Sequence, residues 1–257
     1  MTGRAGASAP EAVSFSEEEG VLYLHLGHQP WVQSAMRIDD PHALELEYVR
    51  QMTSWLAFLH APARLAVLGL GGGSLVRWSL KHLTRTRVDA VDHNPSVILA
   101  AQTMFGLPKK GRRLRLFPED ALAWVHQADA GAYGVVLVDL YDGAARGPVL
   151  DSVVFYSAAR RLLDPAGSIL VVNLFGEASR LQPSLTRLRR AFDDRILLLP
   201  PTAAGNRVAL AFVGPPLDLN HPALPARLDA LQARFGFPYA SWLSDALASG
   251  GLDREKA

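Results

Sequence analysis

The sequence predicts a doubly wound α/β protein with a mostly parallel, seven-stranded sheet covered by helices on both faces. Short apolar runs alternate with segments of helical periodicity along most of the chain. These runs are nearly continuous in apolar residues, which is typical of strands buried on both faces of a parallel sheet. One run, residues 65–70, breaks directly into a glycine-rich turn and a helix, the order expected where such a sheet binds a ligand.

The glycine-rich turn predicts a nucleoside site in a Rossmann-like sheet. Gly69, Gly71 and Gly73 follow the first strand, residues 75–83 have helical spacing, and the next strand, 88–91, ends in Asp92. Glycine lets a ligand approach the backbone, and a helix start offers unpaired N–H groups. An acid at the tip of the second strand can accept hydrogen bonds from both hydroxyls of a ribose. A tight turn without a ligand is the alternative interpretation.

The remaining elements follow in order. Two strands at 20–26 and 31–38, joined by a turn at 27–30, predict an amino-terminal β-ribbon that leans on the main domain or on another subunit. Asp40 and Pro41 predict the start of a helix whose apolar face runs to Leu59. Further strands are expected at 114–117, 134–140, 168–173, 196–199 and 208–213, the last two antiparallel, and helices at 95–105, 121–127, 151–163, 180–192, 224–235 and 239–248.

This pattern divides the chain into four parts. Residues 1–12 are expected to be a disordered tail, 13–40 a small β appendage, 41–215 the Rossmann-like nucleoside-binding catalytic domain, and 216–257 a helical extension. The sequence leaves open whether that extension packs on the sheet or forms a subunit contact.

Composition excludes several classes of protein. The chain has 257 residues, a formal net charge of +1 and no cysteine, so disulfides and cysteine nucleophiles are absent. The histidines do not have metal-ligand spacing, and we expect no metal. There is no secretory signal pattern and no apolar run long enough to span a membrane, so we expect a cytoplasmic protein without membrane association.

Four acids stand at or just beyond successive strand ends: Asp92, Asp120, Asp139 and Asp142. In an open parallel sheet, ligands bind beyond the carboxyl ends of the strands. Asp92 suits a ribose, and Asp120 suits an adenine amino group or, alternatively, a simple helix cap before Ala121. Asp139 and Asp142 follow the most apolar strand, beside the reactive end of a nucleoside cofactor.

The chain resembles proteins with the class I methyltransferase fold, and specifically the spermidine synthase family. The resemblance rests on residues 65–92, the Glu119, Asp120, Ala121 step, the VLVDLYDG segment, the GHQPWVQSAM segment, and the Phe155, Tyr156 helix. It implies transfer of an aminopropyl group from decarboxylated S-adenosylmethionine to a polyamine-type amine, with release of methylthioadenosine. It also implies a homodimer.

The resemblance assigns roles residue by residue. It places Gly69, Gly71 and Gly73 at the methionine-derived end of the cofactor, Asp92 at the ribose and Asp120 with Ala121 at the adenine. Asp139 is then the acceptor of the amine's proton, Asp142 orients the amine, and Tyr48 lies near the active centre. Gln33 corresponds to a glutamine that contacts the cofactor, and His93, next to Asp92, is a further cofactor-binding candidate.

Two other functions share these motifs. One is methyl transfer from S-adenosylmethionine, and the other is nucleoside binding by a homologue without catalysis. The chain departs from the family at Tyr48, which is followed by Val49 and Arg50 instead of His and Glu. Nucleic acid is not an expected partner, because the basic residues 109–115 lack interleaved aromatics and the chain is nearly neutral.

Overall fold

The computed structural model describes residues 12–27, 32–109, 111–141, 150–176 and 178–251, apart from the side chains of 178–180. A central sheet of seven strands has the order β6-β5-β4-β7-β8-β10-β9, in which β10 runs antiparallel to both of its neighbours. This confirms the predicted mostly parallel sheet and the antiparallel final pair. The strands are β4 Arg64–Leu68, β5 Arg87–Val91, β6 Leu114–Phe117, β7 Val135–Val138, β8 Ser168–Phe175, β9 Ile196–Leu198 and β10 Asn206–Val213.

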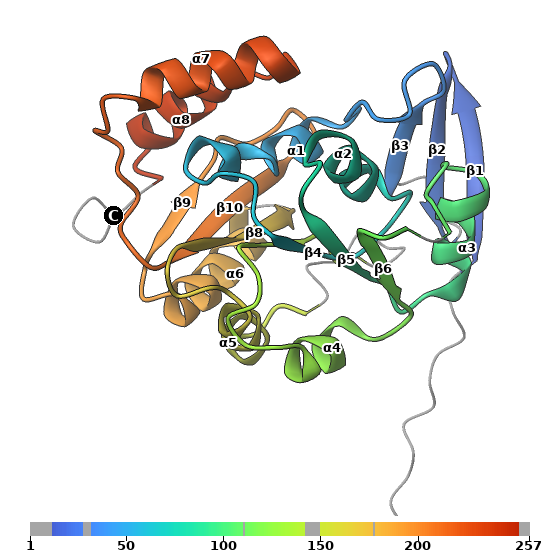
Figure 1. Ribbon diagram of the computed structural model, residues 1–257, viewed down its shortest axis with the longest axis horizontal. Helices are drawn as coiled ribbons and strands as arrows, with labels where there is room; N and C mark the ends of the chain where they lie inside the picture. The colour runs from blue at the N-terminus through green and yellow to red at the C-terminus, as the bar shows by residue number, and fades with distance from the viewer. Residues whose placement is uncertain (1–11, 28–31, 110, 142–149, 177, 252–257) are drawn as a thin grey trace, which may run out of the picture.

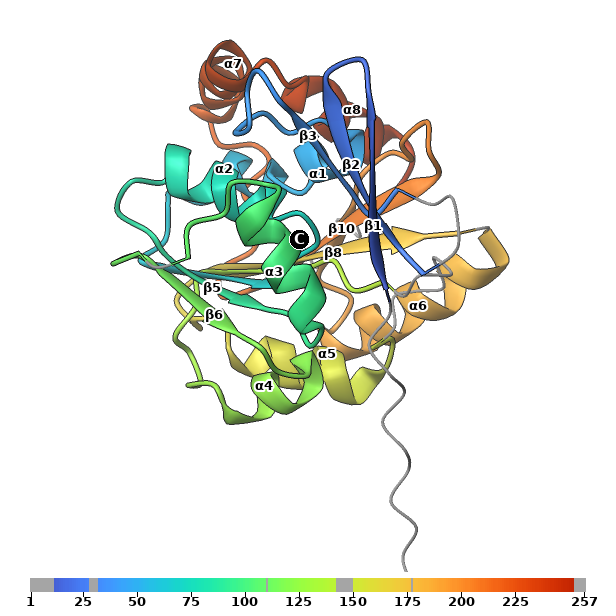
Figure 2. The ribbon, with the colours of Figure 1, turned by 90° about the vertical axis from the view of Figure 1, so that its right-hand side faces the viewer.

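Helices cover both faces of this sheet, as the prediction of a doubly wound fold requires (Figure 1). One face carries α1 Glu47–Gln51, the 3₁₀ turn η1 Ser54–Ala57, α2 Ser74–His82, α3 Pro95–Thr103, α7 Leu224–Phe235 and α8 Tyr239–Ala248. The other carries α4 Ala121–Gln127, α5 Val153–Arg161 and α6 Ala178–Ala191. The same two layers are seen after a quarter turn (Figure 2).

Alternate residues of each strand supply the two cores. In β4, Leu65 and Val67 pack under α1, α2, α7 and α8, whereas Ala66 and Leu68 pack under α4, α5 and α6. Successive side chains of a strand point to opposite faces, so a strand that is apolar at every position fits only between two helical layers.

The amino-terminal appendage has three strands instead of the two predicted. β1 Val13–Glu18 pairs with β2 Val21–Leu26, which pairs with β3 Ser34–Arg37, all antiparallel. Five of the six residues of β1 are exposed, so the strand adds little to the core, although Val13 and Phe15 alternate with Ser14 and Ser16. Leu24 and Met36 pack against Ala100 and Phe105, so the appendage leans on the main domain through α3 and the loop after it.

The helix predicted from Asp40 and Pro41 does not begin there. The Asp40 carboxylate accepts a hydrogen bond from the backbone N–H of His42, which makes a local turn, and α1 begins only at Glu47. α1 and η1 replace the single long helix that the prediction contained. The apolar face was nevertheless read correctly, since Leu44, Met52 and Trp55 are buried.

The carboxyl-terminal helices α7 and α8 pack on the main domain. Leu228, Tyr239 and Trp242 join the core under that face of the sheet, and the Tyr239 and Thr53 hydroxyls lie 2.7 Å apart in a buried hydrogen bond. The structure thus shows the first of the two arrangements that the sequence left open.

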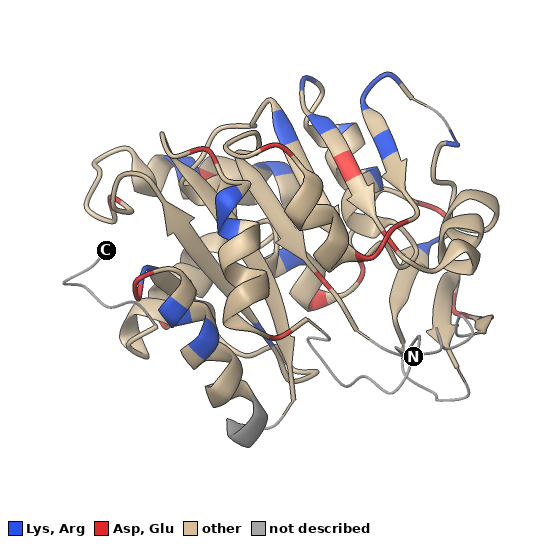
Figure 3. Cartoon of the chain, turned by 90° about the horizontal axis from the view of Figure 1, so that it is seen from below, with Lys and Arg blue, Asp and Glu red and all other residues tan. Residues whose placement is uncertain are grey.

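The surface carries both signs of charge. Acidic and basic segments are interspersed along the described chain, in agreement with the net charge of +1 (Figure 3). Within the described ranges, none of the helices is long and apolar enough to cross a membrane.

Asp89, which is buried in β5, links this strand to side chains of the neighbouring strands β4 and β6. Its carboxylate accepts hydrogen bonds from Arg115 at 2.7 and 2.6 Å, Arg64 at 3.0 Å and the Tyr133 hydroxyl at 2.6 Å. Burial alone would raise the pKa of Asp89, but these donors bring it below its ordinary value. A lowered pKa stabilises the fold above the unfolded value, and this contribution is lost as the pH falls through the folded value.

We expect Asp89→Asn to lower the free energy of unfolding by about 2–4 kcal/mol, because it removes the charge from a buried ion pair. Asp129→Asn is the matched control, since Asp129 also pairs with Arg64, at 3.4 Å, but its side chain is 80% exposed. We expect the control to cost less than about 1 kcal/mol. Urea denaturation of both variants at pH 7 measures the difference, and equal losses would contradict the role given to Asp89.

Candidate active site

The glycine-rich turn and the predicted acids lie together at the carboxyl ends of the parallel strands. The glycine-rich turn follows β4, Asp92 follows β5, Asp139 follows β7 and Asp120 lies just beyond β6. Because β6, β5, β4 and β7 are neighbours in this order and parallel, their carboxyl ends meet along a single line. Asp142 lies outside the described residues.

Gly69 is required by the approach of two backbones. Its φ is +91°, and a Cβ built on it would lie 2.0 Å from the carbonyl oxygen of Asp139. A second close approach occurs at Gly72, where a Cβ would come within 3.0 Å of Phe105 and Ser34. The turn therefore packs tightly between the end of β7 and the amino-terminal appendage. This packing brings Gly71 beside the backbone of Gln33, another predicted cofactor residue.

Asp92 is tied to the glycine-rich turn. One of its carboxylate oxygens accepts the backbone N–H of Leu70 at 3.0 Å and the other accepts that of Asn94 at 2.9 Å. Burial raises the pKa of Asp92 above its ordinary value, against these backbone donors, which lower it. Each carboxylate oxygen has more than one acceptor position, so both can still receive a ribose hydroxyl.

Asp120 caps α4. Its Oδ1 accepts the backbone N–H of Ala123 at 2.9 Å, which is the N-cap geometry weighed from the sequence. The cap holds Asp120 at the site edge, directly before the buried Ala121. His93, exposed and adjacent to Asp92, lies along the same edge.

Asp139 is the chemically distinctive residue. Its Oδ2 accepts the Tyr48 hydroxyl at 3.2 Å and its Oδ1 accepts the Asn173 side-chain amide at 2.8 Å. Burial raises the pKa of Asp139 to about 6, and the hydrogen bonds from Asn173 and Tyr48 oppose that rise. A carboxyl group with a pKa near 6 is ionised at neutral pH yet is a stronger base than an exposed aspartate.

A cavity of about 380 Å³ opens onto Asp139. Tyr48 and Glu47 of α1 line one side, and Asn173, Phe175 and Asn206 of the adjacent strands β8 and β10 line another. The rest of the lining is Val32, Gln33, Leu46, Tyr141, Thr202 and Ala204. The cavity therefore combines apolar walls with two described carboxylates, those of Asp139 and Glu47, and suits a small cation.

Several lining residues were not among the predicted site residues, and three of them carry carboxylate or amide groups: Glu47, Asn173 and Asn206. Asn173 is the single polar residue between Val172 and Leu174 in an otherwise apolar stretch of β8, and that interruption was the available signal. Asn206 opens β10, and Glu47 directly precedes Tyr48. Neither has a local pattern that marks it.

Arg50, which stands where the family has a glutamate, is bound to backbone carbonyl groups outside the cavity. Its guanidinium donates to the carbonyl oxygens of Leu44 at 2.6 Å and Glu45 at 2.7 Å. It also lies over the Phe237 ring, 5.9 Å from the centroid, and does not line the cavity. The positive charge of Arg50 is therefore occupied in supporting α1.

Two residues of the basic segment 109–115 also serve the fold. Arg113 donates to the carbonyl oxygens of Leu80 at 2.7 Å and Leu83 at 3.0 Å, and Arg115 pairs with Asp89. These two guanidinium groups therefore have partners within the fold.

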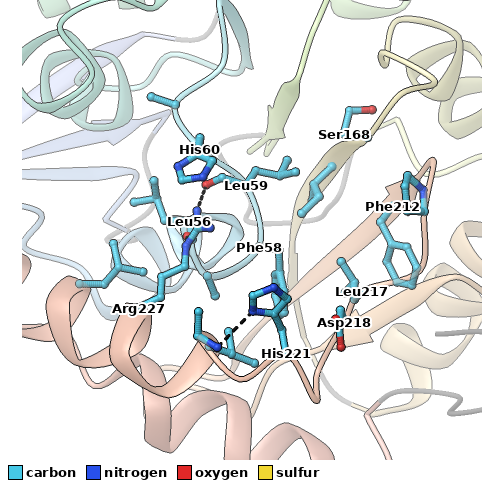
Figure 4. A pocket seen from close by; sticks show the side chains of 18 of the residues that line it. Leu56, Phe58, Leu59, His60, Ser168, Phe212, Leu217, Asp218, His221 and Arg227 are labelled. Carbon is cyan, nitrogen blue, oxygen red and sulfur yellow. Dashed lines mark hydrogen bonds between the residues drawn. The ribbon is translucent and has the colours of Figure 1, made fainter.

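A larger cavity of about 920 Å³ lies at the opposite edge, where β8 begins and β10 ends (Figure 4). Two of its polar side chains, Arg227 and His221, have backbone partners. Arg227 donates to the carbonyl oxygens of Leu56 and Leu59, and His221 accepts the N–H of Ala223 at 3.1 Å. The Arg227 bonds attach α7 to the main domain, and no predicted site residue lines this cavity.

Comparisons with known proteins agree with this geometry. No protein-family model matches the chain. A polyamine aminopropyltransferase of Neisseria meningitidis is 36% identical over 245 residues, which cover 92% of this chain and 89% of that protein. A probable spermidine synthase from Corynebacterium glutamicum has a similar structure, with a TM-score of 0.71, 19% identity, and coverage of 98% of this chain and 96% of that chain.

Methyltransferases share the fold. Human methyltransferase-like protein 13, solved in complex with SAH, matches with a TM-score of 0.64 and 24% identity, covering 75% of this chain and 94% of that chain. The fold alone therefore does not separate aminopropyl transfer from methyl transfer. The sequence identity does, since it extends over nearly the whole length of both proteins, and it shows that this chain belongs to the polyamine aminopropyltransferase family.

Proposed function

We propose that this transferase moves an aminopropyl group from decarboxylated S-adenosylmethionine to a polyamine-type amine and releases methylthioadenosine. The observation that carries the proposal is the half-buried carboxylate of Asp139, which faces a small cavity beside the glycine-rich turn. Relatives that are polyamine aminopropyltransferases support the reaction class.

The donor would bind along the carboxyl ends of β4, β5 and β6. Asp92 suits the ribose, because its fixed oxygens keep acceptor capacity, and the site edge at Asp120 suits the adenine. The proposed donor contacts are completed by Gln33, Gly69, Gly71, Gly73, His93 and Ala121. Within the described residues no group of side chains could hold a metal ion, and the proposed steps use none.

The reaction would be a direct displacement. The acceptor arrives as an ammonium ion, and Asp139 takes its proton and exposes the nitrogen lone pair. The nitrogen attacks the aminopropyl carbon, the new N–C bond forms as the C–S bond breaks, and the electron pair of that bond stays on sulfur. The positive charge passes from sulfonium to the new secondary ammonium, and the proton on Asp139 is released to water. The protein contributes mainly the alignment of nitrogen, carbon and sulfur.

Tyr48 would keep the Asp139 carboxylate in place during this step. Burial raises the pKa of Tyr48 well above its ordinary value, so its hydroxyl stays protonated and donates. Asp142 as the residue that orients the amine, and a homodimer as the functional assembly, remain predictions from the family resemblance.

Glu47 is expected to attract the second charge of a diamine. Its carboxylate lines the cavity and accepts the N–H of Ala203 at 3.0 Å, which holds it in place. Because an exposed ion pair is worth up to about 1 kcal/mol, Glu47→Gln should raise KM for a diamine about two- to five-fold and leave kcat unchanged. Glu45→Gln is the matched control, since Glu45 does not line the cavity. An equal rise in KM for a monoamine would contradict this role.

Calorimetric titration and a product assay test the proposed function. We expect decarboxylated S-adenosylmethionine to bind more tightly than S-adenosylmethionine, and putrescine or spermidine to yield methylthioadenosine. Preference for S-adenosylmethionine would instead indicate methyl transfer. Binding without turnover on any amine would indicate a non-catalytic nucleoside-binding protein, and lack of binding of every nucleoside would overturn the proposed donor site.

A further inference from the structure

A chain of buried amide side chains connects Asp139 to the start of β10. Asn173 donates through Nδ2 to Asp139 at 2.8 Å, and Asn206 donates through Nδ2 to the Oδ1 of Asn173 at 3.0 Å. Asn173 is 2% exposed and Asn206 is 7% exposed. The two asparagines therefore form a relay, Asn206 to Asn173 to Asp139, from which water is largely excluded.

The ionised state of Asp139 determines which group donates and which accepts in each hydrogen bond of the relay. An ionised carboxylate can only accept hydrogen bonds, so Asn173 must turn its NH₂ group toward Asp139. Its carbonyl oxygen then faces Asn206, and Asn206 must present its own NH₂ group. If Asn206 were an acceptor instead, Asn173 would rotate its NH₂ group toward that acceptor and present its carbonyl oxygen to Asp139. A carbonyl oxygen beside Asp139 favours the protonated carboxyl group.

The backbone holds Asn206 independently of its side chain. Its N–H donates to the Thr202 hydroxyl at 3.0 Å, and its carbonyl oxygen accepts the Thr202 N–H at 2.9 Å. Asn206 also lies opposite Phe175 in the antiparallel β8 and β10 pair. A substitution that changes only the side chain therefore leaves the turn and the strand pairing in place.

The other titratable groups around Asp139 do not set the orientation of the Asn173 side-chain amide. Tyr48 donates to the opposite carboxylate oxygen, and the Tyr141 hydroxyl donates to the backbone carbonyl of Asn173 at 2.7 Å. Glu47 lines the same cavity. These are the titratable groups of the described chain that face Asp139 from α1 and from the segment after β7, and none of them bonds to the Asn173 side-chain amide.

We infer that Asn206 is a positioning residue that keeps Asp139 ionised and oriented by fixing which end of the Asn173 amide faces it. The inference rests on the proposed function, in which Asp139 receives the proton of the amine. It predicts that the chemical identity of residue 206 controls the pH at which the enzyme becomes active.

The test compares pH profiles of kcat/KM for Asn206→Asp, Asn206→Leu and Ala204→Asp. Ala204 lines the same cavity and is exposed, so Ala204→Asp adds an equal charge without touching the relay. We expect Asn206→Asp to move the acid limb upward by about one pH unit or more, which is a loss of about five-fold or more at pH 6 and a small loss at pH 8.5. Asn206→Leu, which removes the donor, should move it in the same direction by less.

Two results would overturn the inference. A shift in Ala204→Asp as large as that in Asn206→Asp would show that added charge alone is responsible. A loss that is the same at every pH would show a merely structural role. Asn206→Leu supplies the comparison if Asn206→Asp does not fold.

A direct titration separates this inference from the proposed function. The ¹³C carboxyl resonance of Asp139, identified by its disappearance in Asp139→Asn, reports protonation without turnover. We expect it to shift in Asn206→Asp by clearly more than in Ala204→Asp. If the wild-type protein transfers no aminopropyl group but the resonance shifts as expected, the proposed function fails and the relay stands. An unchanged resonance with normal turnover would refute the relay alone.

Discussion

Asp139→Asn is expected to lower kcat by about 10²- to 10⁴-fold, the usual contribution of a general base. An amide cannot take the proton of an ammonium ion, whereas its size and shape are those of the carboxylate. Donor binding should persist, because Asp92 and the glycine-rich turn are untouched. Single-turnover product assays together with calorimetric titration of methylthioadenosine separate the loss of chemistry from a loss of binding.

The pH dependence gives an independent test of the same residue. Since burial raises the pKa of Asp139 to about 6, kcat/KM of the wild-type enzyme should rise through pH 6 and level off above it. Asp139→Asn should remove this limb. Fold stability depends on pH in the opposite direction from activity. A pKa raised above its ordinary value of 3.8 favours the fold when the group is protonated, and this contribution is lost as the pH rises through about 6.

Tyr48→Phe is the control variant for Asp139→Asn, because it alters one hydrogen bond to the carboxylate and leaves the base in place. A residual rate in Asp139→Asn as high as in Tyr48→Phe would remove Asp139 from the proposed reaction. Loss of methylthioadenosine binding in Asp139→Asn would mean that the residue holds the donor.

Gly69→Ala is expected to have the largest effect on stability, preventing folding or lowering the free energy of unfolding by several kcal/mol. The added methyl group would lie 2.0 Å from the Asp139 carbonyl oxygen, so β4 and β7 would have to separate at the site edge. That separation breaks the bond from the Asp139 N–H to the Leu68 carbonyl, which is 2.8 Å long.

Gly106→Ala isolates the effect of close approach from the effect of backbone conformation. Gly106 also has a positive φ, +66°, but nothing lies within 4 Å of the position of its Cβ. We expect Gly106→Ala to cost only about 1–2 kcal/mol, the ordinary penalty of a left-handed residue. Urea denaturation of both variants tests the contrast, and similar costs would show that contact with β7 does not matter.

Elements with a strong local signal were predicted almost to the residue. The apolar runs of β4 and β5 match, because a strand buried on both faces is mostly apolar, although Asp89 interrupts the run in β5. The helices α7 and α8 have the predicted bounds, 224–235 and 239–248. Each is limited by glycine or proline, residues whose effect on the backbone is local.

The errors have equally specific causes. β1 was missed although Val13 and Phe15 alternate with serines, because this alternation is short and the strand is held mainly by pairing with β2. Asp40 and Pro41 have the residue types of a helix start, but the Asp40 carboxylate closes a turn with His42 instead. A local pattern of this kind is compatible with both structures, and the packing of the segment after it decides between them.

The sequence by itself determined the doubly wound fold, the family resemblance and the acids at the strand ends, because each depends on residues close together along the chain. Only the tertiary structure decided the environment of Asp139. Tyr48 lies 91 residues away from it in sequence, and Asn173 meets Asn206 across 33 residues through the antiparallel pairing of β8 and β10. The burial that raises the pKa of Asp139 and the donors that oppose it are properties of neighbours in space, and a linear pattern does not contain them.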